Sequence, residues 1–257
     1  MKILFIILLV NLMACSTFDD GAFDMEPIEQ GEDNESEEED QATTITAHDG
    51  CKYKVVTIGN QIWFAENLKA ETFNDGSLLP AVTDDDSWDD DYGDNWLPAR
   101  SVYDNEESNR TALGYLYNHY CVNPAYNGGK NICPEGWHIP SLSEWEELRL
   151  FVKPGSAGTG TNRAGGPLME TGTSYWNSND YGTDEFGFGA RAAGDRSGSS
   201  GSFGDKGRNA FYWTSTCEEP QSGGGRAHFI SISQSGNILF GTPKTKKMGF
   251  SCRCIKD

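Results

Sequence analysis

Stretches of β-branched and aromatic residues, several with apolar positions at every second residue, predict a fold rich in short strands. Residues 53–58 and 61–65 have this composition and flank Gly59-Asn60, a pair typical of a tight turn, so they predict a hairpin. Residues 210–215, 228–233 and 238–240 give further strands in the C-terminal third. The pattern therefore favours antiparallel sheets joined by long loops.

One helix has a clear start. Ser141 is placed as its N-cap, and Glu144 follows three residues later, which together form a capping box. Pro154 ends the helix. The apolar residues between them recur at helical spacing: Trp145, Leu148 and Val152. The sequence thus predicts an α+β fold with one main helix at about 142–153.

The N-terminus has the pattern of an export signal. Lys2 precedes the apolar run Ile3 to Val10, which is short for a membrane span. The run ends in Leu12-Met13-Ala14-Cys15, which resembles the bacterial lipobox. This resemblance predicts residues 1–14 as a lipoprotein signal peptide and Cys15 as the lipidated residue. Ser16 then implies sorting to the outer membrane, and an ordinary secretory signal is the alternative.

Negative charge is concentrated near the predicted anchor. The formal charge of the chain is −19, and residues 19–40 hold twelve acidic side chains and no Lys or Arg. Such a segment buries too little apolar surface to fold, so residues 15–47 are predicted as a disordered acidic linker. Residues 48–257 form the predicted domain. The charge argues against a nucleic-acid partner, because phosphate binding needs a basic surface.

Cysteines bear on both stability and chemistry. Six remain when Cys15 is set aside: Cys51, Cys121, Cys133, Cys217, Cys252 and Cys254. An even number in an exported chain predicts disulfides, although the count leaves their connectivity open. A redox-active or metal-binding pair at Cys252 and Cys254 is the alternative.

Candidate binding residues lie in segments with the composition of loops. Trp88, Trp96 and Trp176 are expected to expose rings for stacking on sugars, and burial in the core is the alternative. The aspartates of the acidic stretch 84–94 predict a possible Ca²⁺ site through Asp89, Asp91 and Asp94, although no EF-hand spacing is present. A solvated loop is the alternative. The four histidines show no catalytic metal spacing, and no catalytic constellation emerges.

Six ordered motifs carry a family resemblance. They lie at residues 58–68 (IGNQIWFAENL), 114–118 (GYLYN), 133–148 (CPEGWHIPSLSEWEEL), 170–177 (ETGTSYWN), 211–216 (FYWTST) and 249–257 (GFSCRCIKD). Together they resemble the Fibrobacter succinogenes major paralogous domain, FISUMP, over about residues 50–257. The central block is also similar to the C-type lectin-like fold, including its formylglycine-generating branch. That similarity implies that the N- and C-terminal strands are adjacent.

The resemblance also bears on the cysteines. The family's common cysteines match Cys133 and Cys254, which implies a Cys133–Cys254 disulfide. Cys217 and Cys252 lie on strands expected to be neighbours and are predicted as a second pair, which leaves Cys51 with Cys121. The sequence departs from the family's usual Trp at His119, Leu-Pro at Arg191-Ala192 and Val at Cys252.

Three functions remain open. The leading expectation is a surface-exposed outer-membrane lipoprotein with a non-enzymatic module for polysaccharide binding or adhesion. One alternative is an oxidase similar to the formylglycine-generating enzymes that uses Cys252 and Cys254. Another is a structural component of the cell surface that binds protein.

Overall fold

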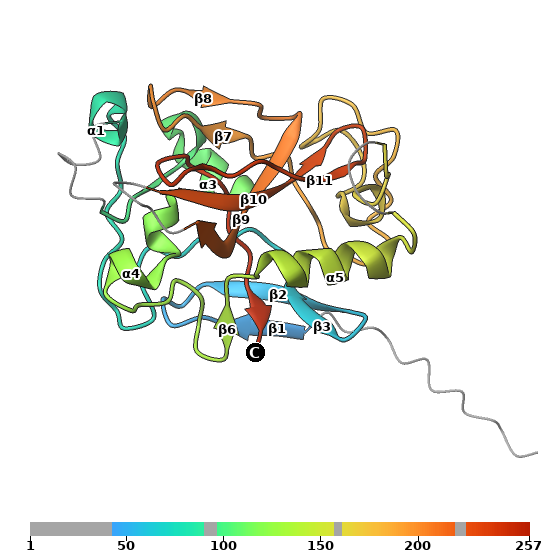
Figure 1. Cartoon of the computed structure of the whole chain (residues 1–257), viewed down its shortest axis with the longest axis horizontal. Helices are drawn as coiled ribbons and strands as arrows, with labels where there is room; N and C mark the ends of the chain where they lie inside the picture. Colours follow the sequence, from blue (N-terminus) through green and yellow to red (C-terminus); the bar gives the residue numbers. More distant parts are fainter. Residues whose placement is uncertain (1–42, 90–96, 157–160, 219–224) are drawn as a thin grey trace, which may run out of the picture. The chain divides into compact units, whose positions relative to one another are not determined.

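Antiparallel strands pair into two main sheets in the computed structural model, which describes residues 43–89, 97–156, 161–218 and 225–257 (Figure 1). These residues all belong to one compact unit, Gln41–Asp257. The fold is mixed, with mostly antiparallel sheets, a few short helices and one disulfide. Among the described helices, none has the length and hydropathy needed to cross a membrane.

The first sheet joins the two ends of the domain. Its strand order is β1-β2-β3-β13-β6, with β1 (Thr43–Thr46), β2 (Lys52–Ile58), β3 (Gln61–Phe64), β13 (Ile255–Lys256) and β6 (Trp137–His138). The predicted hairpin is confirmed as β2 and β3, in which Val56 pairs with Trp63. Ile255 pairs with Trp63 on one side and His138 on the other. The expected adjacency of the N- and C-terminal strands is therefore confirmed.

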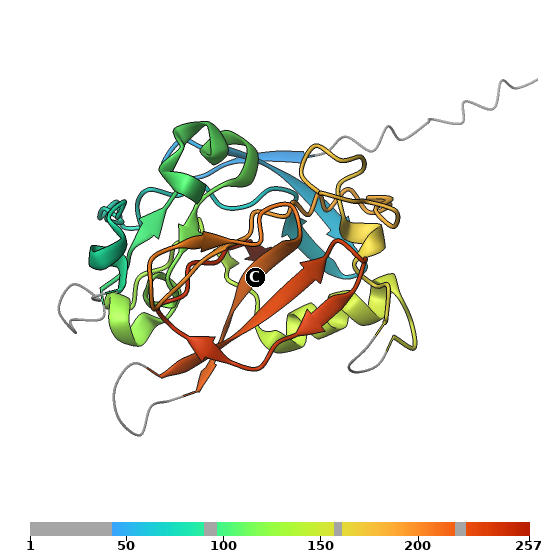
Figure 2. The same cartoon turned by 90° about the horizontal axis from the view of Figure 1, so that it is seen from above.

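The second sheet contains the strands predicted in the C-terminal third, coloured orange to red in Figure 2. It is built on β10 (Arg226–Ser233), which pairs with β9 (Asn209–Glu218), β11 (Ile238–Phe240) and β12 (Lys244–Thr245). Two short ladders lie outside the main sheets. They pair β4 (Arg100–Ser101) with β5 (Leu116–Tyr117) and β7 (Asp195–Arg196) with β8 (Phe203–Gly204).

Helices are short except for one. The described helical segments are α1 (Asp85–Asp89), η1 (Tyr103–Asn105), α3 (Glu107–Leu113), η2 (His119–Cys121), α4 (Pro124–Asn127), α5 (Leu142–Val152) and η3 (Gly166–Leu168). The predicted main helix is α5, and its capping box is present. The amide of Glu144 donates to Ser141 Oγ at 3.3 Å, and the amide of Ser141 donates to Glu144 Oε2 at 2.7 Å. Local chemistry therefore sets where this helix begins.

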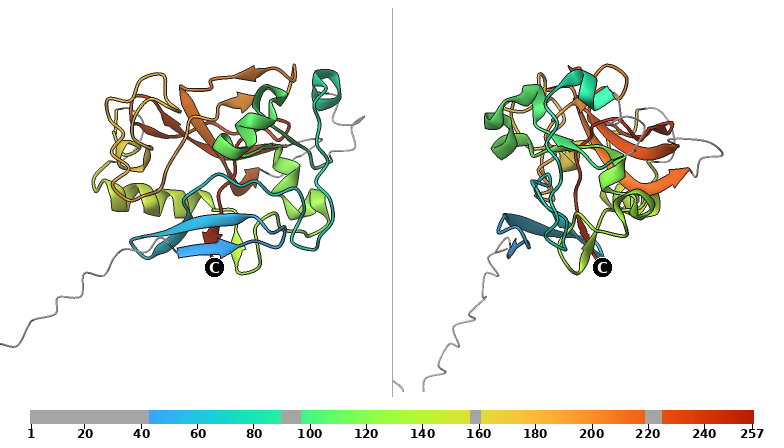
Figure 3. Two further views of the ribbon diagram at one scale, coloured as in Figure 1. Left: turned by 180° about the vertical axis from the view of Figure 1, so that it is seen from behind. Right: turned by 90° about the vertical axis from the view of Figure 1, so that its left-hand side faces the viewer.

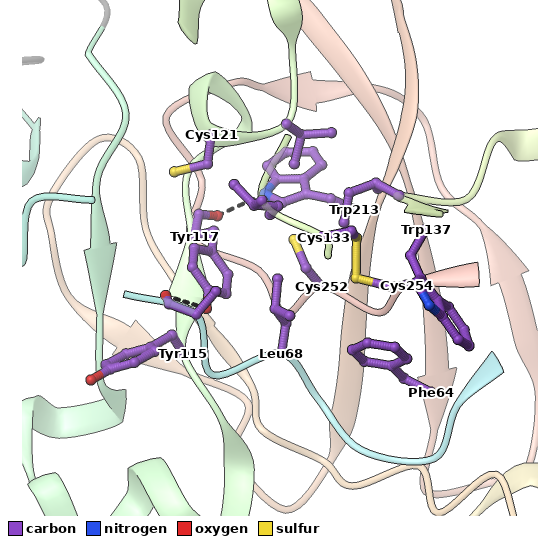
Figure 4. Close-up of a cluster of buried hydrophobic side chains, with 14 of the residues drawn as sticks. Phe64, Leu68, Tyr115, Tyr117, Cys121, Cys133, Trp137, Trp213, Cys252 and Cys254 are labelled. Atoms are coloured by element: carbon purple, nitrogen blue, oxygen red, sulfur yellow. Dashed lines mark hydrogen bonds between the residues drawn. A yellow bond between two sulfur atoms is a disulfide. The ribbon is translucent and has the colours of Figure 1, made fainter. Parts of the chain in front are cut away.

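A disulfide lies within one of the main hydrophobic clusters. Cys133 and Cys254, whose Cα atoms are 5.9 Å apart, are bonded as the resemblance implied. Figure 4 shows them beside the aromatic side chains of Phe64, Trp137 and Trp213. The bond links the segment before β6 to the segment before β13, so it fastens these two adjacent strands to each other.

The other two predicted disulfides are not formed. Ser251 bridges Tyr212 on β9, which places Cys252 near Trp213. Cys217 lies four residues further along β9, and at about 3.3 Å per residue it is roughly 13 Å away, too far for a disulfide. The pairing was predicted from the adjacency of the strands alone. A disulfide also requires the two cysteines to lie opposite each other in the register of those strands.

Cys51 and Cys121 occupy different surroundings. Cys51 is half-buried at the wall of a surface cleft. Cys121 is fully buried in η2, and its thiol donates to the carbonyl oxygen of Ala99 at 3.3 Å. The pair had been assigned because these two cysteines remained, and the fold gives them no common location.

Candidate ligand-binding groove

The structure does not expose the tryptophans that were expected to stack on sugars. Trp88 is 4% exposed, and its indole N–H donates to the carbonyl of Lys247 at 3.1 Å. The buried guanidinium of Arg196 covers its ring at 4.5 Å from the centroid. Trp176 is 1% exposed and donates to the carbonyl of Ala190. The expectation of exposed rings is wrong at both positions, because long-range contacts bury them, and Trp96 lies outside the described residues.

The predicted calcium ligands are only partly described. Asp89 closes α1, whereas Asp91 and Asp94 lie outside the described residues. Within the described ranges, no three His, Cys, Asp or Glu side chains are grouped so that they could hold a metal ion. The Ca²⁺ site at these aspartates stays a prediction.

Cys252 and Cys254 do not form a pair of thiols. The sulfur of Cys254 is bonded to Cys133. Cys252 is fully buried, and this burial raises the pKa of its thiol well above the ordinary value. A thiolate is the reactive form of cysteine, so this site lacks the two accessible sulfurs that the oxidase alternative requires.

A groove beside helix α3 combines aromatic and polar side chains. Its volume is about 460 Å³, and it is lined by residues of the segments 103–113, 173–177 and 206–207 together with Ala192. We name it the α3 groove. In Figures 1 and 3, α3 lies near β7 and β8, on the opposite side of the domain from β1. The first described residues of the chain therefore enter the domain away from this groove.

Unusual backbone conformations shape the groove. Asp104 and Asn105 both have φ of +55°, in the left-handed region that Asp and Asn tolerate better than other side chains, and they reverse the chain ahead of α3. On the other wall, Gly207 has φ of +79°, and a Cβ there would lie 2.3 Å from Oδ1 of Asn177. The amide of Asn177 also donates to the carbonyl of Gly207 at 2.7 Å. Only glycine allows this close approach.

Two tyrosines contribute rings to the groove. The ring of Tyr103 packs on Phe203 at a centroid distance of 5.2 Å, and the ammonium of Lys206 lies 5.1 Å from its centroid. Tyr175 is half-buried, with the guanidinium of Arg191 at 4.3 Å from its ring centroid. Arg191 is in turn ion-paired with Glu170. Both rings are thus held in place by neighbouring side chains.

Polar groups surround these rings. Thr173, Ser174, Asn177 and Asp104 line the groove and are exposed. Lys206 Nζ donates to Oδ1 of Asn109 at 3.1 Å across one edge. Aromatic surface with a few hydroxyl, amide and carboxylate groups is the usual composition of a small-molecule site, and it suits hydroxyl-rich ligands.

Carboxylates influence the ionisation of groups near the groove. Burial raises the pKa of Tyr103, and the charges of Asp104, Asp195 and Asp205 raise it further. Burial, together with the charge of Asp205, raises the pKa of Asp195 to about 6. Among the described residues that line the groove, the charged groups are the carboxylate of Asp104 and the ammonium of Lys206.

Sequence reasoning selected the wrong aromatic residue in this segment. Trp176 was singled out, but its neighbour Tyr175 presents the more exposed ring. Trp176 is buried and its indole N–H donates to the carbonyl of Ala190, which leaves the half-buried Tyr175 as the more exposed ring. Tyr103 was missed because nothing in the sequence places residue 103 beside residues 173–177.

Two other clefts differ in chemistry. One, of about 660 Å³, is lined by charged groups that include Glu71 and Arg110, which are ion-paired with each other at 2.7 Å. The other, of about 640 Å³, lies between α5 and β11 and is lined by exposed Leu239 and half-buried Phe240. The α3 groove differs from both because its lining includes two tyrosine rings and several exposed hydroxyl and amide groups.

Comparison with known proteins identifies one family. The model of the Fibrobacter succinogenes major domain matches residues 56–256. No curated protein and no solved structure matches the chain.

Proposed function

Because the chain belongs to the Fibrobacter succinogenes major domain family, we propose that it is a surface lipoprotein whose domain binds an extracellular polysaccharide in the α3 groove. The family suggests a surface protein. The lipobox-like sequence at Cys15 supports a lipid anchor in the outer membrane, and the acidic linker would hold the domain away from the membrane. Adjacent terminal strands and mostly antiparallel sheets support a C-type lectin-like fold.

The observation that carries the proposal is the half-buried ring of Tyr175 beside exposed Thr173, Ser174 and Asn177 in one groove, with Tyr103, which is 8% exposed, forming part of the wall. A ring face can stack on the apolar face of a sugar, while hydroxyl and amide groups exchange hydrogen bonds with its hydroxyls. Helix α3, which borders the groove, lies on the side of the domain away from β1 (Figure 3). A long polymer could reach it there. The proposal assigns the domain no catalytic role.

The test is binding of the exported protein to a panel of soluble and insoluble polysaccharides, with Ca²⁺ and with a chelator. We expect Tyr175→Ala to weaken binding about two- to thirteenfold, since an aromatic contact contributes about 0.5–1.5 kcal/mol. Tyr181→Ala is the matched control. Tyr181 is 40% exposed and also carries an arginine, Arg163, over its ring, but it lies outside the groove. Equal loss in both variants, or no binding to any polysaccharide, would contradict the proposal.

A second candidate is a structural component of the cell surface that binds another protein. The apolar cleft between α5 and β11 favours it, because exposed apolar surface is common at protein interfaces. Mild crosslinking on intact cells would distinguish the two functions. A co-purifying protein whose capture is lost in Leu239→Ser and kept in Tyr175→Ala would support this candidate.

A further inference from the structure

The imidazole of His138 lies between two carboxylates. Its Nε2 is 2.9 Å from Oε1 of Glu144, and its Nδ1 is 2.6 Å from Oδ1 of Asp257. His138 belongs to β6, Glu144 lies in the first turn of α5, and Asp257 directly follows β13. One side chain therefore joins the start of the main helix to the end of β13, which lie together in Figure 1.

The two contacts together require a protonated ring. A neutral imidazole has one N–H donor and one acceptor nitrogen, whereas an imidazolium donates from both nitrogens. Ionised carboxylates only accept hydrogen bonds. A neutral ring of His138 would therefore place a lone pair against an oxygen of one carboxylate, and that contact would be lost.

The contact with Asp257 is the one more easily lost. Oε2 of Glu144 already accepts from the amide and the hydroxyl of Ser141 at 2.7 and 2.8 Å, so the capping box fixes this carboxylate. The side chain of Glu144 is 28% exposed, whereas that of Asp257 is 60% exposed and can exchange its partner for water. Loss of the proton should therefore release Asp257 and leave Glu144 in place.

The carboxylates that face His138 favour its protonated form. Burial lowers the pKa of the ring, but the hydrogen bonds to Asp257 and Glu144, and the charges of both, outweigh burial and raise the pKa above the ordinary value of 6.5. On β13, uncharged Ile255 is paired with His138, whereas Lys256 is paired one position along β6. The ring therefore changes its charge in a range of pH that exported proteins encounter.

We propose that His138 is a pH-operated latch, which holds the end of β13 against the start of α5 when its ring is protonated and releases it when the ring is neutral. The release is confined to residues 256–257, because Ile255 is 2% exposed and the disulfide at Cys254 fastens the segment before it. The latch thus controls a local opening at the end of the first sheet rather than unfolding of the domain.

The direction of the pH effect follows from the raised pKa of His138. Stabilisation by the latch is fully present below about pH 6.5, the ordinary histidine value, and is lost as the pH rises through the raised value. None of the latch residues lines the α3 groove, so the latch does not depend on the proposed polysaccharide ligand.

Amide hydrogen exchange of the full-length protein in detergent measures the release. The amide of Asp257, which donates to the carbonyl of Gly136 at 3.0 Å, and the amide of Lys256 report on it. Each rate is divided by the intrinsic rate at the same pH, which gives a protection factor. We expect protection to fall about threefold or more between about pH 5.5 and about pH 8. Equal protection at both pH values would overturn the proposal.

Variants test whether His138 is responsible. His138→Gln should remove the pH dependence of protection, because an amide side chain has no ionisation in this range. Glu147→Gln, at an exposed carboxylate on α5, is the matched control and should keep it. A pH dependence that persists in His138→Gln, or that is lost equally in Glu147→Gln, would also overturn the proposal.

Titration of the ring by NMR is a second measurement, made on the unmodified protein. The chain has four histidines, so the ring signals of histidine-labelled protein are few enough to assign. We expect the pKa of His138 to lie above 6.5, and to move back toward that value in Asp257→Asn, which removes one carboxylate. A pKa of His138 at or below 6.5 in the unmodified protein would contradict the latch.

Discussion

Nε and Nη2 of Arg253 both donate to Oδ1 of Asn67, each at 3.1 Å. Arg253 is fully buried, and its remaining N–H groups donate to the carbonyls of Phe64, Phe188 and Gly189. Its guanidinium also lies 4.1 Å from the ring centroid of Phe188. Arg253 thus links the segment before β13 by hydrogen bonds to Phe64 at the end of β3, to Asn67 after it and to residues 188–189.

Arg253→Lys should destabilise the domain by about 2–4 kcal/mol. Lysine keeps the charge but lacks the planar fork of donors, so several buried acceptors would lose their partners. Chemical denaturation measures the change in free energy of unfolding. Arg208→Lys, at an exposed position, is the control, and a similar small effect in both variants would show that the network contributes little.

Replacing both Cys133 and Cys254 by serine should lower the free energy of unfolding by about 2–5 kcal/mol. The bond joins residues separated by 121 positions, so its loss frees a long loop in the unfolded chain. Alkylation without reduction, followed by peptide mass spectrometry, should recover Cys133 and Cys254 in one linked peptide. Cys51→Ser is the control for loss of a sulfur, because Cys51 is outside any disulfide in the structure. Finding Cys133 alkylated in the native protein would contradict the prediction.

Ionisation of Asp195 should lower the free energy of unfolding as the pH rises. Its folded-state pKa is about 6, against an ordinary value of 3.8, so folding favours the protonated form. The stabilisation of the folded state by protonated Asp195 is fully present below about pH 3.8. It is lost as the pH rises through 6. The charges that act on it are Asp205, which raises its pKa, and Lys244, which opposes that effect.

Asp195→Asn, which mimics the protonated form, should therefore raise the melting temperature at pH 7.5 and change it little at pH 4. Melting curves at the two values provide the measurement. Asp180→Asn, at an exposed carboxylate, should give no such difference. A stabilisation by Asp195→Asn that is equal at both pH values would refute the assignment of this effect to ionisation.

Cys15→Ser should abolish incorporation of labelled palmitate and release the protein from the membrane fraction. A diacylated cysteine supplies the chains that hold such a protein in a bilayer, and no described helix could replace them. In intact cells, added protease should digest the unmodified protein if the domain faces outward. Cys51→Ser should keep the label, and loss of label in that variant would contradict assignment of the anchor to Cys15.

Local sequence patterns predicted the elements that local chemistry determines. The hairpin at Gly59-Asn60 and the start of α5 at Ser141 were predicted because turn residues and a capping box act within a few positions. Burial of Trp88 depends on Arg196, which is distant in sequence, and no periodicity reveals that contact. The register that separates Cys217 from Cys252 is likewise a long-range property.

The candidate site was the least predictable part of the molecule. Its rings and polar groups come from residues 103–113, 173–177 and 206–207, which meet only in the folded chain. The sequence indicated that segment 173–177 contains aromatic and hydroxyl side chains. It did not indicate which aromatic ring faces outward, because the direction depends on what Trp176 packs against.

The position of β13 between β3 and β6 has a consequence for how the protein is made. The hairpin β2–β3 is synthesised early, but the neighbour of β3 is a segment near residue 255. Until that segment has been synthesised and has paired, β3 has an open edge that can pair with other chains. Folding dominated by such distant pairings is slow. We therefore expect folding of this protein to depend on holding chaperones, and shortening the chain before residue 255 to cause aggregation.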